Sequence, residues 1–150
     1  MYKQLLLEML AQNQMTCSFT FDNITHENSR HRLTKEAASV GFIYRHMGET
    51  MNLFGTFFGI PTHVQNTTMR QQDVGQHYDL DSSHRMVTEG YKMLEDYVVA
   101  APDASWLEVI ETPFFGTVSR IRLFSHILFH NSHHAGQISL TLARSEVQAY

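Results

Sequence analysis

The sequence predicts an all-α protein in which four helices form a bundle in one domain, residues 1–150. Four segments carry apolar residues at helical spacing, and none shows a strand pattern or an internal repeat. A chain of 150 residues can bury about 68–70% of the surface that it exposes when unfolded, which suffices for one core. Hydrophobic residues make up 43% and charged residues 17% of the chain, a composition typical of globular proteins.

The first helix is expected over residues 2–15. Its buried stripe at helical spacing consists of Leu6, Met9 and Leu10. The polar stretch 22–32 that follows has no such period, so it is expected to connect the first helix to the second or to form a short extra turn.

The second helix is expected over residues 35–58, with Thr34 as its N-cap and with Gly59 and Pro61 at its end. Its apolar residues follow one another in steps of four and three: Val40, Tyr44, Met47, Met51, Phe54 and Phe58. Segment 60–80 has no clear period and is long for a structureless loop, so we expect it to pack locally or to cover something.

The third helix is expected from a cap at Asp81 or Ser82 to about Val99, and the fourth from a cap at Thr117 to about Arg144. The apolar stripe of the third helix is Met86, Met93, Leu94 and Tyr97. The stripe of the fourth is Ile121, Phe124, Leu128, Ala135, Ile138 and Leu142. These patterns complete the predicted bundle.

Charge and cysteine content exclude several classes of function. Eleven Lys and Arg against fifteen Asp and Glu give a net charge of −4 without a basic run, so nucleic acid is not an expected partner. The first residues hold an apolar run too short for a signal or a membrane span, so no membrane association is expected. Cys17 is the single cysteine, which excludes an internal disulfide and a thiolate zinc site and favours a reducing cytoplasm.

Histidine is the unusual residue of this sequence, with ten copies in 150 residues. His126, His130 and His134 follow one another in steps of four, a spacing that places imidazoles on one helix face. With His130 at zero on a helical wheel, His134 lies at roughly 40°, at the edge of the apolar stripe. His126 and His133 lie at roughly −40° and −60°, towards solvent or a subunit boundary. The wheel therefore favours His130 and His134 as paired ligands.

The second helix offers a third ligand. His46 stands beside the apolar stripe of that helix, where a buried imidazole needs a partner. A single histidine on an apolar face is commonly a hydrogen-bonded core residue, but a pair spaced by four and a third on another helix favour a metal. Three neutral imidazoles at His46, His130 and His134 suit a divalent transition metal such as zinc or nickel, with positions left for water or a ligand.

The sequence leaves several roles open for the other polar residues near these ligands. His126 and His133 could support the ligands or lie at the surface, and His63 and His77 in the loop are weaker candidates. Glu49 could orient His46, act on a metal-bound water or simply be solvated.

The late segment HILFHNSHHAGQ, residues 126–137, together with His46, resembles the DinB/YfiT-like superfamily of metal-binding four-helix proteins. The resemblance implies an up-down-down-up bundle, commonly homodimeric, with a metal near one open end at His46, His130 and His134. It also implies kinship with thiol-dependent transferases and isomerases. Ala135 stands where many relatives carry an arginine, which weakens any transfer of substrate class.

The leading functional hypothesis is a metal-dependent thiol S-transferase-type enzyme that acts on a small molecule. The metal would activate a low-molecular-weight thiol, because nothing in the sequence places Cys17 beside the site. Two alternatives remain: a non-catalytic metal- or small-molecule-binding stress protein, and a metal-dependent hydrolase with Glu49 as general base.

Overall fold

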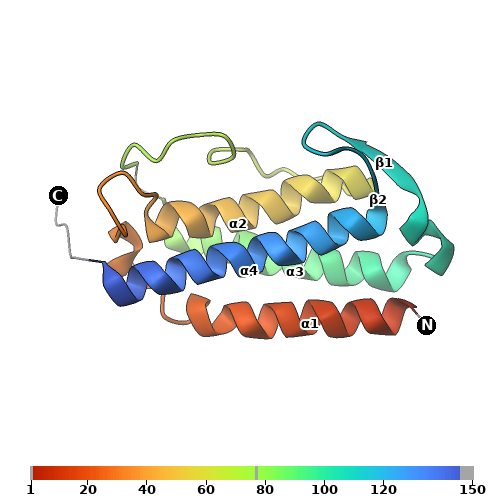
Figure 1. Ribbon diagram of the computed structural model, residues 1–150, viewed down its shortest axis with the longest axis horizontal. Helices are drawn as coiled ribbons and strands as arrows, with labels where there is room; N and C mark the ends of the chain where they lie inside the picture. Colours follow the sequence, from red (N-terminus) through yellow and green to blue (C-terminus); the bar gives the residue numbers. More distant parts are fainter. Residues whose placement is uncertain (1, 77, 146–150) are drawn as a thin grey trace.

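The computed structural model describes residues 2–76 and 78–145, so His77 lies outside the described residues. Within them the main elements are four long helices: α1 (Tyr2–Phe21), α2 (Val40–Gly55), α3 (Leu80–Ala100) and α4 (Arg120–Arg144). In Figure 1, α1 and α4 run in one direction and α2 and α3 in the other, which is an up-down-down-up order. The predicted four-helix architecture is therefore present. In this part of the chain, no helix combines the length and the apolar character that a membrane span requires.

The apolar stripes of the helices meet in one core. Helix α2 packs against α3 and α4, and α1 packs against the other side of α3 and α4. The largest fully buried apolar side chains are Tyr44, Met47, Met51, Leu94, Leu123, Phe124, Ile127 and Ile138. Most of them lie at the predicted helical spacing, because burial of one face of each helix is what stabilises the bundle.

Helices α2 and α3 approach closely at two glycines. A Cβ atom on Gly48 would lie 2.8 Å from Cβ of Met86 and 3.1 Å from the backbone nitrogen of Val87. A Cβ atom on Gly90 would lie 2.7 Å from Cβ of Met51. Both contacts are closer than carbon atoms normally approach, so the helices can pack at this distance only with glycine at these positions.

We expect Gly48→Ala to destabilise the protein by about 1–3 kcal/mol, because the added methyl group overpacks the interface between α2 and α3. Gly136→Ala is the matched control, since a Cβ atom there meets nothing within 4 Å and replacing a helical glycine by alanine gains about 0.5–1 kcal/mol. Urea unfolding of both variants measures the difference. Equal stability of the two variants would contradict the close approach.

Helix α2 begins five residues later than predicted, because a distant carboxylate organises the segment before it. Ser39, not Thr34, is the N-cap, and its hydroxyl accepts a hydrogen bond from the Phe42 amide. The carboxylate of Asp73 accepts from the amide and the hydroxyl of Ser39 at 2.7 and 2.6 Å, and it pairs with Arg32 at 2.8 Å. These contacts hold an antiparallel bridge between Arg32 and Ser39, so residues 35–39 are not helical although the sequence alone predicts helix there.

A β-hairpin precedes α4, so the prediction of a purely α-helical chain is wrong here. Strands β1 (Val109–Thr112) and β2 (Gly116–Ser119) pair in antiparallel register, with Val109 opposite Ser119. The turn uses Gly116 at φ 63°, a conformation that glycine adopts without strain. Thr117, the predicted cap, therefore lies in a strand, and Ser119 caps α4.

The other predicted boundaries shift by a few residues. Helix α1 continues to Phe21 rather than residue 15, because the fully buried Cys17 anchors its last turns in the core. Asp79, rather than Asp81 or Ser82, caps α3 by accepting a hydrogen bond from the amide of Ser82.

The segment between α2 and α3 runs back along the outside of α2, as the yellow-green trace in Figure 1 shows. Gly59, at φ 84°, ends the short 3₁₀ turn that follows α2, as predicted. Val64 and Thr68 are buried against the bundle. The prediction that this segment packs locally or covers something is therefore confirmed.

Candidate metal centre

Three imidazole rings meet between α2 and α4. Nε2 of His130 lies 3.0 Å from Nε2 of His46 and 3.1 Å from Nε2 of His134. Ligand atoms of the three residues all lie within 4.8 Å of one another, a spacing at which they can hold one metal ion. The structure thus brings together all three residues that the sequence singles out as ligands, and each ring is partly buried.

Hydrogen bonds at the far side of two rings decide where their protons lie. The hydroxyl of Thr68 donates to Glu49 at 2.7 Å, so its oxygen must accept from Nδ1–H of His46 at 3.2 Å. The amide oxygen of Gln137 accepts from Nδ1–H of His134 at 2.6 Å. In a neutral imidazole the other nitrogen then carries a lone pair. Nε2 of His46 and Nε2 of His134 therefore both present lone pairs to the centre.

The contacts of His130 cannot be explained by hydrogen bonds alone. Its Nε2 atom has one in-plane position, which holds either one proton or one lone pair. That position cannot serve His46 and His134 at once, although both lie at about hydrogen-bond distance. A shared cation at the point where the three ring nitrogens converge would satisfy all of them at once.

The spacing also suits a metal. Metal–nitrogen bonds of roughly 2.0–2.1 Å at tetrahedral angles place the nitrogen atoms about 3.3–3.4 Å apart. The observed separations of 3.0 and 3.1 Å from His130 need only small shifts to reach that geometry. The donor set therefore fits a divalent transition metal with three imidazole ligands.

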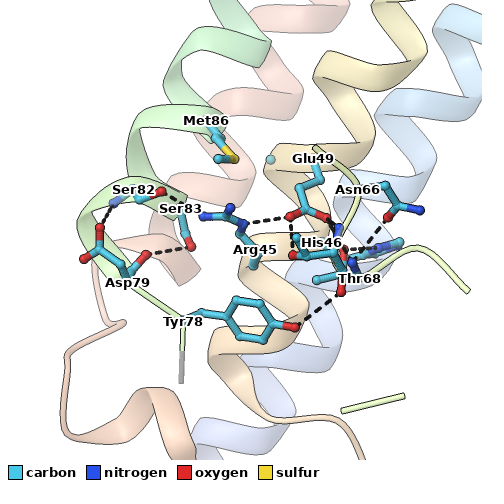
Figure 2. Close-up of polar contacts among 12 residues, drawn as sticks. Arg45, His46, Glu49, Asn66, Thr68, Tyr78, Asp79, Ser82, Ser83 and Met86 are labelled. Atoms are coloured by element: carbon cyan, nitrogen blue, oxygen red, sulfur yellow. Dashed lines mark hydrogen bonds and ion pairs between the residues drawn. The ribbon is translucent and has the colours of Figure 1, made fainter. Parts of the chain in front are cut away.

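Glu49 lies behind His46 on the same helix and fixes its orientation (Figure 2). Its Oε1 atom accepts from Nε of Arg45 at 2.8 Å and from the hydroxyl of Thr67 at 2.6 Å. Its Oε2 atom accepts from the amides of Thr67 and Thr68 at 2.9 and 3.0 Å and from the hydroxyl of Thr68. One buried carboxylate thus ties α2 to the returning segment and, through Thr68, to the imidazole of His46.

The network continues to α3. Nη1 of Arg45 donates to the hydroxyl of Ser82 at 2.8 Å, near the capped start of that helix. On the other side, Oδ1 of Asn66 accepts from the amides of Thr68 and Met69 and shapes the turn that presents Thr68 (Figure 2). Three separate parts of the chain therefore hold one metal-ligand candidate in place.

Two of the sequence interpretations of Glu49 are wrong. The side chain is fully buried rather than solvated, and hydrogen bonds occupy both of its oxygens, so it is not a free general base. Burial alone would raise the pKa of Glu49, but the hydrogen bonds from Thr67, Arg45 and Thr68 outweigh burial and hold the pKa below its usual value. Glu49 is therefore ionised, and it orients His46.

The environment keeps the three imidazoles neutral. Burial, reinforced by the neighbouring rings, lowers the pKa of His130 to about 2. Burial lowers the pKa of His134 to about 4, against the opposing hydrogen bond to Gln137. Burial also lowers the pKa of His46, although the charge of Glu49 acts in the opposite direction. Neutral imidazoles are the form that binds metals.

We expect the metal-free protein to lose stability as the pH falls below about 6.5, the pKa of histidine in an unfolded chain. Below that pH the unfolded state takes up protons on His46, His130 and His134 that the folded state does not accept. Falling pH therefore stabilises the unfolded state relative to the folded one. The contribution of His134 is lost by about pH 4, where its imidazole titrates in the folded state, and that of His130 continues to fall to about pH 2. Urea midpoints of chelator-treated protein from pH 8 to 4 measure it. An unchanged midpoint between pH 7.5 and 5 would contradict the depressed pKa values.

His126 lies in an aromatic environment that the sequence did not predict. Its ring centroid is 4.5 Å from that of Phe115 and 5.9 Å from that of Phe54, so the β-hairpin covers it. It is partly buried rather than directed to solvent. Its ring centroid is 5.9 Å from that of His130, but His126 does not belong to the ligand group of the described residues.

The remaining candidates lie apart from the ligand group. His133 is exposed, as the helical wheel predicts, and its ring only adjoins that of His134. His63 is exposed in the returning segment. Cys17 is fully buried in α1, and burial raises the pKa of its thiol, so it is not poised as a nucleophile.

Two residues that position the ligands escaped the sequence analysis in that role. Thr68 lies in the aperiodic segment 60–80, where nothing in the sequence indicates that it meets His46. Gln137 follows His134 by three positions, a helical spacing that places the two side chains on one face and could have revealed their contact.

An up-down-down-up bundle that gathers three histidines from α2 and α4 defines a class of helical proteins with a candidate metal centre. The model of the DinB family matches residues 1–144, and the chain therefore belongs to the DinB family. The resemblance that the late histidine segment indicates is thereby confirmed.

One solved structure shares the fold over almost its whole length. It is described as the crystal structure of a conserved protein from Enterococcus faecalis, and it is 12% identical to this chain. The alignment covers 93% of this chain and 96% of that one, with a TM-score of 0.65. At this identity the similarity shows the fold alone. No curated protein matches the sequence.

Proposed function

We propose that this chain binds one divalent transition metal, zinc or nickel, through His46, His130 and His134, and that it is a thiol S-transferase-type enzyme for a small molecule. The observation that carries the proposal is the convergence of three Nε2 atoms with the lone pairs of His46 and His134 directed to one point. Three protein ligands, rather than four, are typical of catalytic metal sites, which keep a position for water or substrate.

A metal in this position supplies Lewis acidity that lowers the pKa of a thiol or of water. The protein's own part is to hold the ligands. Thr68 and Glu49 fix the ring of His46, and Gln137 fixes that of His134. Since Cys17 is buried in the core, the reacting thiol is expected to come from a low-molecular-weight cosubstrate.

The hydrolase alternative with Glu49 as general base loses support. The carboxylate accepts five hydrogen bonds and has no exposed surface, so it cannot take a proton from water without breaking this network. A non-catalytic metal-binding protein uses the same ligands and is the outcome against which the proposal is tested.

The test incubates zinc- or nickel-loaded protein with a low-molecular-weight thiol and 1-chloro-2,4-dinitrobenzene. Transfer forms a sulfur–carbon bond, releases chloride and gives the thiol proton to solvent. We expect the loaded wild type to accelerate thioether formation and His46→Ala to match the uncatalysed rate. Metal uptake without any acceleration, over a panel of thiols and electrophiles, would favour the non-catalytic alternative.

We also propose that the protein works as a homodimer in a reducing cytoplasm. The single cysteine forms no disulfide within the chain, which suits that compartment. Phe129 on α4 is an apolar side chain that is 72% exposed, and burying it against a second copy would favour a dimer. Light scattering of wild type and Phe129→Glu tests this, and a monomeric wild type would contradict it.

A further inference from the structure

A pocket of about 400 Å³ opens directly beside two of the three histidines. His46 and His134 form one part of its wall, between the first half of α2 and the last turns of α4. The rest of the wall is mainly apolar: Leu33, Ala37, Ala38, Phe42, Ile43 and Leu140. Its volume lies within the roughly 300–1,000 Å³ that small-molecule sites occupy.

The polar groups of this wall are largely engaged within the protein. The hydroxyl of Thr68 is held between Glu49 and His46, and that of Thr141 donates to the backbone oxygen of Gln137. The amide oxygen of Gln137 accepts from His134, which leaves only its amide nitrogen free to donate to a ligand.

Among the described residues that line the pocket there is no lysine, arginine, aspartate or glutamate. Arg32 and Arg45, which precede the lining residues Leu33 and His46 in the sequence, are both paired within the protein, Arg32 with Asp73 and Arg45 with Glu49. A carboxylate or phosphonate on the part of a ligand that lies against the apolar wall, away from the histidines, would lose its hydration without gaining a side-chain cation. A neutral apolar group would instead leave water for an apolar wall.

Resting on the proposed function, we propose that this pocket binds the organic part of an uncharged, apolar small molecule and places its reacting polar atom against His46 and His134. The preferred ligand class is therefore neutral and hydrophobic, such as an aryl or alkyl compound. Molecules that carry a negative charge on the organic part are disfavoured, because the described residues of the lining offer that part no charged side chain.

The first experiment compares two thiol probes on cobalt-loaded protein. Phenylmethanethiol is neutral and apolar, whereas 3-mercaptopropionate carries a carboxylate, and both report on sulfur binding through cobalt absorption. We expect phenylmethanethiol to bind about tenfold more tightly or better, because its ring enters the apolar pocket. Equal affinity, or tighter binding of 3-mercaptopropionate, would overturn the inference.

A matched pair of variants tests whether the pocket causes the preference. Leu140 is a pocket residue that is 51% exposed, so Leu140→Arg adds a cation at the rim without burying it, and the preference should shrink or reverse. Leu107, 73% exposed in the 3₁₀ turn Asp103–Leu107 that follows α3, serves as the control. Leu107→Arg should leave the preference unchanged. A shift of the same size in both variants would assign the effect to net charge and overturn the inference.

A metal-free measurement separates this inference from the proposed function. Toluene should shift the methyl resonances of Ala38 and Leu140 in chelator-treated protein, and benzoate should not. Failure to take up cobalt would overturn the proposed function, while the response to toluene would still support the apolar pocket. Normal cobalt uptake with no response to toluene would overturn the pocket inference alone.

Discussion

Substituting His130 by alanine is expected to abolish tight metal binding. His130 is the central ligand candidate, because its Nε2 atom lies within 3.1 Å of the Nε2 atoms of both His46 and His134. Its loss removes a direct ligand, so the affinity should fall by more than the roughly 10–100-fold that loss of an outer-shell partner costs. Competition with a chromophoric chelator measures the change for zinc and nickel.

His133→Ala is the control for this prediction. His133 lies three residues from His130 on the same helix and is exposed, and it does not belong to the ligand group. Its removal should leave metal affinity unchanged. Equal loss of metal in His130→Ala and His133→Ala would show that the face of α4 has been assigned wrongly.

Glu49→Ala is expected to destabilise the protein by about 3–5 kcal/mol, the typical effect of removing one partner of a buried ion pair. The side chain of Arg45 is only 15% exposed, so it would keep a largely buried charge without a partner. The backbone amides of Thr67 and Thr68 would lose their acceptor as well. Urea unfolding measures the change. The exposed Glu95 on α3 is the control, and Glu95→Ala should alter the stability by no more than about 0.5 kcal/mol.

Metal affinity should depend on the same network through a single hydroxyl. Thr68→Val removes the acceptor for Nδ1–H of His46, and we expect about 10–100-fold weaker metal binding. Thr67→Val removes a hydrogen bond to Glu49 that does not reach His46, so it should weaken binding much less. Equal metal affinity of the two variants would show that the proton position on His46 is not set by Thr68.

The ligand positions could be predicted because they follow from local spacing. His130 and His134 are four residues apart on one helix, and His46 lies beside the apolar stripe of another, so periodicity alone directs them to one interface. The same periodicity predicts that each of the four helices exists. The residues that orient the ligands cannot be predicted in this way, because Thr68 lies in the aperiodic segment 60–80 and meets Glu49 from nineteen positions away in the sequence.

Long-range contacts also explain the errors at the ends of elements. Asp73 organises the start of α2 from 34 residues away. For this reason Ser39 caps the helix rather than Thr34, the residue that the sequence predicts. The β-hairpin did carry a local signal, since β-branched residues such as Val109 and Val118 flank a turn that ends in Gly116. Strands of four residues are too short for periodicity to reveal them. Because the hairpin covers His126, the sequence predicts this side chain to be nearer to solvent than it is.

Elemental analysis of the protein, purified without a histidine tag, beside its His46→Ala variant tests the central claim most directly. His46 comes from a different helix than the other two ligand candidates, so its loss tests the site as a whole rather than the pair on α4. The account predicts about one equivalent of zinc or nickel in the wild type and almost none in the variant. A wild-type protein that is purified without metal and does not bind added zinc or nickel would contradict this prediction.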